Sequence, residues 1–587
     1  MGFSIDFSKI KAIFKKDFVN KKPPKRALRI VISLLITAAV AAVYYYWKYP
    51  CLNVQSQSFW YFLILIAVVF GIVTFAVNGL FSRRSGKPKY KKYAAKTTVM
   101  VSGTVAVVCA LVLVVGAIVS SVFFSPKKYA KLINLDTEGN FAQEVDEIGF
   151  DEIPLLDTDS AIKLGDAKLG ELSEMVSQYE VDSAYYTQIN YKGAPYRVCD
   201  LRYGDFFKWW RNTKDGIPAY VSVNMNTQEA NVIMLSNIGN GDGMHYSESE
   251  WFNHKLSRYV QMRYPTAMIY EYNFEVDENG VPYWIIPCES KTIGLFGGET
   301  ISSVIILNAV TGESKMVDIE EVATKKEYNW IDRANSSSLV VEQYNYYGKY
   351  RNGFWNSIFG QKGVTVATTG YNYIAQNDDV YMYTGVTSVT NDSSNIGFLL
   401  SNQRTKQSTF YKVSGATESV AQNSANGQAQ NYEYNATFPI LLNVGGQPTY
   451  LMAMKDSSDL VKGYAMVNVK QYQVVSFAND TDPLVCRDKY ISLLLSKKII
   501  ADESEVETQN NGITGKIADI RTADISGNTI YYIKLAGSAS YYSISAADNQ
   551  NAVLLNKGDT VTISYKAENQ GKTIVPIGEL VSAQSKK

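Results

Sequence analysis

Three long apolar runs near the N-terminus limit what this chain can fold into more than any other feature of its sequence. Residues 27–47, 59–81 and 98–124 contain a single charged side chain, Arg29. Each run reaches the roughly 20 residues that an α-helix needs to cross about 30 Å of hydrocarbon. A helix of a soluble domain rarely stays apolar on every face over such a length. The sequence therefore predicts three transmembrane helices within residues 27–124.

Basic flanking segments predict the orientation of these helices. The segment before the first run ends in "KKDFVNKKPPKR", and the loop between the second and third runs contains "SRRSGKPKYKKYAAK", whereas the loop between the first two runs holds only Lys48. Lys and Arg concentrate in cytoplasmic loops. We therefore expect a cell-membrane protein with a cytoplasmic N-terminus and with the residues after 124 on the extracytoplasmic side. A cleaved signal peptide is the alternative for the first run, but its length and the aromatic residues 44–47 at its outer end favour a retained helix.

The first 26 residues form a basic cytoplasmic segment of amphipathic character. Phe3, Phe7, Ile10, Phe14 and Phe18 recur at helical spacing among lysines. This pattern is typical of a helix lying on an anionic inner leaflet. A short helix packed on a partner is the alternative interpretation.

Charge and cysteine content exclude some classes of protein. The net charge is +1, whereas nucleic-acid-binding proteins usually carry a clear basic excess, so we expect no nucleic-acid partner. Five cysteines are scattered over 587 residues and form no dense disulfide framework. This suits the envelope of a Gram-positive bacterium better than a eukaryotic ectodomain, although one bridged pair stays open.

Four segments of the region after residue 124 share one pattern. Each consists of an apolar strand, an Asn, a short polar turn and a second strand, over residues 220–233, 304–317, 397–411 and 464–475; the Asn residues are Asn224, Asn308, Asn402 and Asn468. Asn side chains bond to nearby backbone groups and Gly supplies a positive φ, so these residues suit tight hairpins. Further strands and a helix candidate precede the hairpins. The clearest helix candidate is "SESEWFNHKLSRYVQMRYP", where Ser247 and Glu250 match a capping box. One helix on an antiparallel sheet gives a two-layer α+β module.

The predicted fold is a membrane protein with three N-terminal transmembrane α-helices, exported α+β tandem repeat modules and a C-terminal small β-barrel. The barrel is expected because five short strands with Gly turns follow residue 512, as in an OB-like fold. The expected boundaries are a cytoplasmic segment at 1–26, the transmembrane domain at 27–124, modules at 125–240, 241–325, 326–416 and 417–480, a linker helix at 481–511 and the barrel at 512–587.

The order of helix, "DENG"-type hairpin, apolar strand, "NAVTGE" and strand resembles the PepSY-type module of bacterial exported proteins. The resemblance covers residues 160–480; it is best in the second module and poorest in the fourth, which lacks a Gly in its turn. It implies binding or inhibition of extracytoplasmic peptidases, or envelope regulation, without enzymatic activity. The whole chain also resembles uncharacterised three-span envelope proteins of Gram-positive bacteria.

The sequence offers little support for catalysis, so we expect no enzyme, no catalytic residue, no cofactor and no metal site. His245 and His254 are nine residues apart, whereas helical metal pairs need a spacing of four. "NIGNGDGMHY" lacks the Lys of a phosphate loop, and "LDTDSAIKLGD" lacks the third ligand and the Gly of a calcium loop. Asp157 and Asp159 are better explained as caps of a helix that begins near residue 161.

Aromatic clusters are the candidate partner-binding residues. They are Phe206, Phe207, Trp209, Trp210 and Arg211 in "YGDFFKWWRN", Leu295 and Phe296 in "IGLFGG", and Phe354, Trp355 and Phe359 in "GFWNSIFGQKG". Trp, Tyr and Arg dominate binding hot spots. Packing against a neighbouring module or the outer membrane leaflet is the alternative, and it is favoured for most of these residues. The 42 tyrosines are compatible with glycan contact but also with ordinary sheet propensity.

These patterns favour a non-enzymatic, membrane-anchored envelope protein. Its exported modules would bind another protein or assemble with copies of themselves, in a scaffold or accessory role. The first alternative is a regulator or inhibitor of an extracytoplasmic peptidase. The second is a cell-wall or polysaccharide-processing enzyme, which would need a carboxylate pair that the sequence does not locate.

Overall fold

A computed structural model of the chain describes residues 26–83, 90–145, 153–239, 241–376, 379–389, 391–501, 510–525, 528–546, 550–566, 573–577 and 579–582. The amphipathic segment predicted over residues 1–26 lies almost entirely outside these residues. Residues 84–89 of the basic loop also lie outside them, as do residues 502–509 of the predicted linker.

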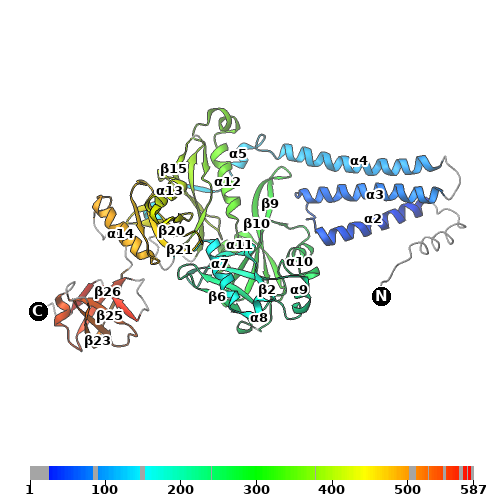
Figure 1. The fold of residues 1–587 in the computed structure, drawn as a ribbon. Coiled ribbons are helices and arrows are strands. Elements are labelled where there is room, and N and C mark those ends of the chain that lie inside the picture. Colours follow the sequence, from blue (N-terminus) through cyan, green and yellow to red (C-terminus); the bar gives the residue numbers. More distant parts are fainter. Residues whose placement is uncertain are drawn as a thin grey trace.

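Three long helices form a bundle at one end of the molecule (Figure 1). They are α2 (Arg26–Lys48), α3 (Gln57–Arg83) and α4 (Tyr90–Val119). Each contains a stretch that is long and apolar enough to cross a membrane, over Ala27–Lys48, Gln57–Asn78 and Thr97–Val119. The prediction of three such helices is confirmed. The third helix ends five residues before its apolar run does, and Ser120, the next residue, accepts the backbone N–H groups of Leu295 and Phe296 through its Oγ.

Within the described residues, the rest of the chain is rich in β-strands, which form five sheets. Four of these sheets share one pairing pattern. In each, two short strands pair with different parts of one long strand. The long strand pairs with a further strand, and that strand pairs with a last one. Every one of these pairs is antiparallel. A helix precedes each of the four sheets. We call these four assemblies units 1 to 4.

Units 1 and 2 lie next to the bundle. Unit 1 contains α7 (Thr158–Gly170), α8 (Ser173–Val176), β2 (Tyr179–Val181), η1 (Ser183–Tyr185), β3 (Thr187–Tyr191), β4 (Ala194–Tyr203), α9 (Phe206–Asn212), β5 (Ala219–Asn224), β6 (Ala230–Met234) and η2 (Leu235–Asn237). Unit 2 contains η3 (Phe252–His254), α10 (Leu256–Arg263), β7 (Met268–Ile269), β8 (Asn273–Val276), β9 (Pro282–Ile293), β10 (Gly297–Asn308) and β11 (Ser314–Asp318), followed by α11 (Ile319–Thr324) and η4 (Lys326–Tyr328).

Units 3 and 4 follow. Unit 3 contains α12 (Ser337–Tyr350), η5 (Asn356–Gly360), β12 (Thr365–Ala367), β13 (Asn372–Gln376), β14 (Asp379–Ser388), β15 (Asn391–Asn402), β16 (Ser408–Tyr411) and β17 (Gly415–Ala416). Unit 4 contains α13 (Glu418–Gln428), η6 (Gln430–Tyr432), β18 (Asn435–Ala436), β19 (Ile440–Val444), β20 (Gln447–Lys455), β21 (Val461–Asn468) and β22 (Val475–Ala478), and α14 (Pro483–Ser496) packs beside it.

The segment between the bundle and unit 1 reaches across to unit 3. It contains α5 (Pro126–Tyr129), β1 (Leu135–Gly139) and α6 (Phe141–Glu144). β1 pairs in parallel with β16, so residues within the stretch assigned to the first module extend the third sheet instead. Sequence patterns could not show this pairing, because its two strands lie far apart along the chain.

Two large apolar cores hold the units in pairs. One core combines units 1 and 2 and includes Tyr220, Phe274 and Trp284. The other combines units 3 and 4 and includes Phe398 and Tyr450. Burial of such side chains is the main favourable term in folding. Each pair of units is therefore a single packed body.

The four hairpin turns have the chemistry expected of their Asn residues. The Oδ1 atoms of Asn224, Asn308 and Asn402 each accept two backbone N–H bonds of 2.9 Å from residues two and three positions later. Asn468 accepts one, from Gln471. In the first three turns the residue four positions after the Asn has a positive φ, between 59° and 73°. The prediction of turn chemistry is confirmed.

The bundle is fixed to unit 2 by many polar contacts. In the loop between α2 and α3, Leu52 N–H bonds to Pro265 O at 2.7 Å, and Gln55 Nε2 bonds to Lys291 O at 2.8 Å. The guanidinium of Arg258, on α10, lies 4.6 Å from the ring centre of Tyr46 and 5.1 Å from that of Trp47. Contacts of this kind fix the orientation of the sheets relative to the helices.

The C-terminal strands form a separate sheet. They are β23 (Asn510–Ile525), β24 (Asn528–Leu535), β25 (Tyr541–Ser545), β26 (Thr560–Lys566), β27 (Ile574–Pro576) and β28 (Glu579–Ser582), with η8 (Gln550–Leu554) between β25 and β26. The strand order is β27-β25-β24-β23-β26-β28, and β23 pairs with different neighbours along its length. The sheet encloses its own small core, which includes Ile533, Val561 and Ile563.

Candidate functional site

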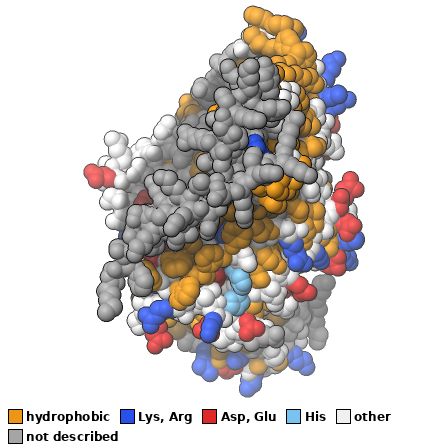
Figure 2. Space-filling view, turned by 90° about the vertical axis from the view of Figure 1, so that its right-hand side faces the viewer, with side chains coloured by type: hydrophobic (Ala, Val, Ile, Leu, Met, Phe, Trp, Pro, Cys, Tyr) orange, Lys and Arg blue, Asp and Glu red, His pale blue; other side chains and the backbone are white. Residues whose placement is uncertain are grey.

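The predicted aromatic residues on α9 lie near the C-terminal end of α2. Trp209 is buried and donates its Nε1–H to Glu250 at 2.6 Å, so it packs within the protein. Phe207, Trp210 and Arg211 are exposed, and Phe206 is half-buried against Trp251. A cavity of about 490 Å³ is lined by Phe206 of this group together with Trp47 of α2. Figure 2, which looks along the bundle, shows hydrophobic side chains on the face around the two histidines.

Leu295 and Phe296 lie at the tip of the β9–β10 hairpin and contact α4. Their backbone N–H groups donate to Ser120 Oγ at 3.0 and 2.9 Å. Phe296 is buried, and its ring lies against Gly116, where a Cβ atom would meet the ring at 2.4 Å. These two residues therefore join the sheets to the bundle and do not form an open surface.

The third aromatic group stands on η5, a single π-helical turn after α12. Trp355 and Phe359 stack with a ring-centre distance of 5.8 Å, and 61 % and 78 % of their surfaces are exposed. The ring of Phe354 packs against the ring of Phe123, with a ring-centre distance of 5.1 Å. Ile358 adds a further exposed apolar side chain. Its exposed rings are about as open as those of Phe207 and Trp210 in the α9 group, which are 77 % and 65 % exposed.

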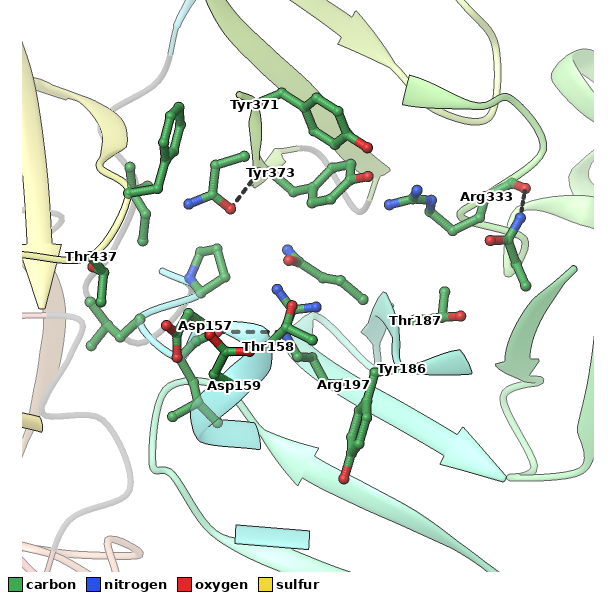
Figure 3. A pocket seen from close by; sticks show the side chains of 18 residues that line it. Asp157, Thr158, Asp159, Tyr186, Thr187, Arg197, Arg333, Tyr371, Tyr373 and Thr437 are labelled. Carbon is green, nitrogen blue, oxygen red and sulfur yellow. Dashed lines mark hydrogen bonds between the residues drawn. The ribbon is translucent and has the colours of Figure 1, made fainter. Parts of the chain in front are cut away.

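A second feature, which the sequence did not indicate, is a polar cavity of about 520 Å³ between the four units (Figure 3). Strands β3, β8, β13 and β19 hold equivalent positions in their sheets, since each pairs with the first long strand of its unit. All four contribute to the wall. Its lining residues are Pro154, Leu155, Leu156, Asp157, Thr158, Asp159, Tyr186, Thr187, Gln188, Arg197, Asn273, Arg333, Tyr371, Asn372, Tyr373, Thr437, Phe438 and Ile440.

Hydrogen bonds between units fix the shape of this cavity. Thr187 Oγ1 accepts a bond of 3.1 Å from the backbone N–H of Phe274, which joins β3 to β8. Asn372 Nδ2 donates to Pro439 O at 3.4 Å, which joins unit 3 to unit 4. The wall is thus held by the same contacts that assemble the four units.

Two arginines supply the positive charge of the cavity. Arg197 comes from β4, and its Nε–H lies 3.5 Å from Leu156 O. Burial lowers the pKa of Arg197 to about 10, and the neighbouring Arg333 adds to this effect. Arg333 comes from the segment before α12, its guanidinium lies 4.3 Å from the ring centre of Tyr373, and its Nε has no hydrogen-bond partner among the described residues. Both side chains point into the cavity in Figure 3.

The acidic groups near these arginines already have other partners. Asp157 accepts from Ser160 N–H at 3.0 Å as the N-cap of α7, and it pairs with Lys455 Nζ at 2.5 Å. Lys455 and Ser160 lower the pKa of Asp157 against the opposing effect of burial. Glu275 accepts the backbone N–H groups of Asp332 and Arg333 at 2.9 Å, and burial raises its pKa to about 7. A cavity of this composition suits recognition of an anion, and its described residues include no paired acid and base aimed at a common point.

The motifs to which the sequence assigns no chemistry have structural roles in the fold. Asp157 caps α7, as expected, although the helix begins at Thr158. The predicted capping box is wrong: α10 begins only at Leu256, and the Glu250 carboxylate accepts from Trp209 and Tyr203 instead.

His254 Nδ1 lies 3.2 Å from His245 O. Among the described residues, no group of three or more His, Cys, Asp or Glu side chains could hold a metal ion. All five cysteines are buried and unbridged.

Comparisons with known proteins add no identity. No protein-family model matches the chain, and no curated protein matches it.

Proposed function

We propose that this protein is a non-enzymatic, membrane-anchored protein of the cell envelope whose extracytoplasmic units bind another protein through the aromatic turn at η5. The observation that carries the proposal is the exposure of Trp355 and Phe359 on an ordered turn. Large exposed apolar patches mark interaction sites, and Trp is enriched in binding hot spots.

The chemistry around η5 indicates the kind of partner. The stretch 348–363 contains Lys349, Arg351 and Lys362 and no acidic residue. Arg351 is occupied by carbonyl groups of the turn, including Gly348 O at 3.2 Å, so it stiffens the segment. A protein surface with an apolar pocket and an acidic rim would complement this patch.

Position distinguishes η5 from the α9 group. Phe206 of the α9 group lines the same cavity as Trp47, at the end of α2 that we propose to be the outer one, where interfacial aromatic residues meet lipid headgroups. The turn after α12 lies farther from the bundle than α9 does (Figure 1), and its ring contacts with the third apolar run involve Phe123, four residues past the end of α4. We therefore assign α9 to the leaflet and η5 to a protein partner.

Site-specific photo-crosslinking in native membranes tests this proposal. A photoreactive amino acid at position 359 should form a protein adduct, and the same group at position 210 should form lipid adducts only. Trp355→Ser should abolish the adduct at 359, whereas Phe207→Ser should leave it unchanged. Absence of a protein adduct at 359, or insensitivity to Trp355→Ser, would overturn the proposal.

The identity of the adduct decides between the narrower hypotheses. A second copy of this chain would indicate self-assembly, and an exported peptidase would favour a regulatory role. Glycan adducts without protein would favour contact with wall polysaccharide and would count against a protein partner.

The proposal includes a finer description of the fold. We propose that units 1 to 4 are PepSY-like tandem repeats, that the six C-terminal strands close into an OB-like barrel, and that the N-terminus is cytoplasmic. The shared strand pairing and the recurring Asn turns support the repeat hypothesis. The basic flanks of the helices support the orientation.

A further inference from the structure

Among the described residues, the two arginines of the shared cavity are buried without an acidic partner in hydrogen-bond contact. Their exposed surfaces are 7 % for Arg197 and 9 % for Arg333. Within the described part of the chain, the one hydrogen bond of the Arg197 side chain is the long contact to Leu156 O, and Arg333 Nε has none. A buried charge without a partner is costly, because water is removed and nothing replaces it. Folds retain such groups chiefly where function requires them.

A buried side-chain amide beside the arginines also lacks hydrogen-bond partners among the described residues. Gln188 on β3 is 1 % exposed, and neither its Nε2 nor its Oε1 has a hydrogen-bond partner within the described ranges. It lines the same cavity, together with Thr158 and Thr437. Buried polar atoms in native proteins are nearly always bonded, so these atoms indicate that the cavity takes a polar ligand.

Among the described residues, no acidic side chain forms a hydrogen bond or ion pair with the two arginines, although Tyr373, Glu271 and Glu275 raise the pKa of Arg333 against the opposing effect of burial. The carboxylate of Asp157 is bound to Lys455, and Asp159 is at the rim. Near Arg333, Glu271 accepts from Ser336 Oγ at 2.9 Å, and Glu275 accepts two backbone N–H groups. The guanidinium groups therefore keep donors free for an incoming anion. Guanidinium is planar and bonds to carboxylate or phosphate through two parallel N–H groups.

The size and the apolar walls of the cavity favour an organic ligand. A volume of about 520 Å³ lies within the range of small-molecule sites and exceeds the size of a simple inorganic ion. The rings of Tyr186, Tyr371, Tyr373 and Phe438 line it. These rings offer flat apolar surface to the uncharged part of a ligand.

We infer that the cavity between units 1 to 4 binds a small organic oxyanion, with Arg197 and Arg333 bonded to its charged group and Gln188 bonded to a polar group beside it. Carboxylate and phosphate share this chemistry. The site is separate from η5, so this inference stands or falls independently of the protein partner.

Thermal unfolding of the full chain in detergent tests the inference with defined probes. The probes are phenyl phosphate, an acetylated dipeptide with a free carboxylate, and the same dipeptide as its amide, each compared with sodium chloride at equal ionic strength. We expect the midpoint to rise with at least one of the two acids, and to rise further with the logarithm of its concentration. The acid that produces the rise identifies the charged group as phosphate or carboxylate. The amide should produce no rise.

Three variants separate binding from folding. Arg197→Gln and Arg333→Gln should abolish the rise, whereas Arg202→Gln, which removes an exposed arginine paired with Glu180, should keep it. Without ligand, Arg197→Gln should unfold at the wild-type midpoint or above it, because it removes a charge that burial and the neighbouring Arg333 already disfavour. A lowered midpoint in both would show that the arginines are structural and would overturn the inference. So would a rise equal to that in sodium chloride, or a rise that persists in the Arg197→Gln/Arg333→Gln double variant.

Discussion

At the scale of single residues, Glu250 couples the stability of units 1 and 2 to pH. The residue is 2 % exposed, and its carboxyl group accepts from Trp209 Nε1 and Tyr203 Oη. Burial raises the pKa of Glu250 from 4.5 to about 7. The folded state therefore holds a proton that the unfolded state releases at a lower pH. The stabilisation is complete below pH 4.5 and is lost as the pH rises to about 7.

We predict that Glu250→Gln reduces this loss of stability. Gln retains the oxygen that accepts from Trp209 but cannot ionise. Between about pH 5 and pH 8 the wild-type free energy of unfolding should decrease as Glu250 ionises. We expect the decrease in the variant to be about 2–3 kcal/mol smaller than in wild type, as measured by urea unfolding of the full chain. Glu313→Gln, at an exposed position, is the control and should behave as wild type. Equal losses in wild type and Glu250→Gln would contradict the prediction.

Gly312 shows how strongly one turn position is constrained. Its φ is 73°, and a Cβ atom would meet the ring of Tyr246 at 2.3 Å. Gly353 also has a positive φ, 92°, but has open space around it. We therefore expect Gly312→Ala to lower the free energy of unfolding by about 1–3 kcal/mol more than Gly353→Ala, since only the first is overpacked. Urea unfolding measures both values, and similar losses would show that φ alone decides the cost.

At the scale of elements, the β9–β10 hairpin connects α4 to the sheets. Its tip bonds to Ser120 and packs Phe296 on Gly116 of α4. Gly116→Val should displace the tip and weaken the contact by about 1–3 kcal/mol. Gly103→Val is a matched control on the same helix, because no atom lies within 4 Å of its Cβ position.

Hydrogen exchange reports this change directly. The amides of Leu295 and Phe296 should exchange faster in Gly116→Val, because their N–H groups lose Ser120 Oγ as acceptor. They should exchange at the wild-type rate in Gly103→Val. Unchanged protection in Gly116→Val would mean that the hairpin tip accommodates the larger side chain.

At the scale of the whole molecule, local sequence patterns predicted individual helices and turns correctly, whereas the contacts between units could not be predicted from such patterns. The three apolar helices and the Asn turns follow from patterns within a few turns of chain, so the sequence predicted them. The cavity requires β3, β8, β13 and β19 to converge, and packing between distant segments controls that convergence. Arg197 lies in a largely apolar strand, "APYRVCDL", whose only other charge is Asp200, and a charge in such a strand is the local feature from which the site could have been suspected. Composition identified the aromatic residues at η5 as candidates but favoured packing for most residues of the three groups; Trp209 and Phe296 are indeed buried, whereas Trp355 and Phe359 are exposed.

The orientation of the whole molecule gives the last prediction. All five native cysteines are buried, so an introduced cysteine can be labelled against a low background. Thr227 is exposed on the β5–β6 turn, and Lys87 lies in the basic loop between α3 and α4. Because basic loops stay in the cytoplasm, a membrane-impermeant maleimide should label Thr227→Cys in intact cells and Lys87→Cys only after permeabilisation. The reverse result would place the cavity of Arg197 and Arg333 in the cytoplasm, and its ligand would then come from the cytoplasmic pool.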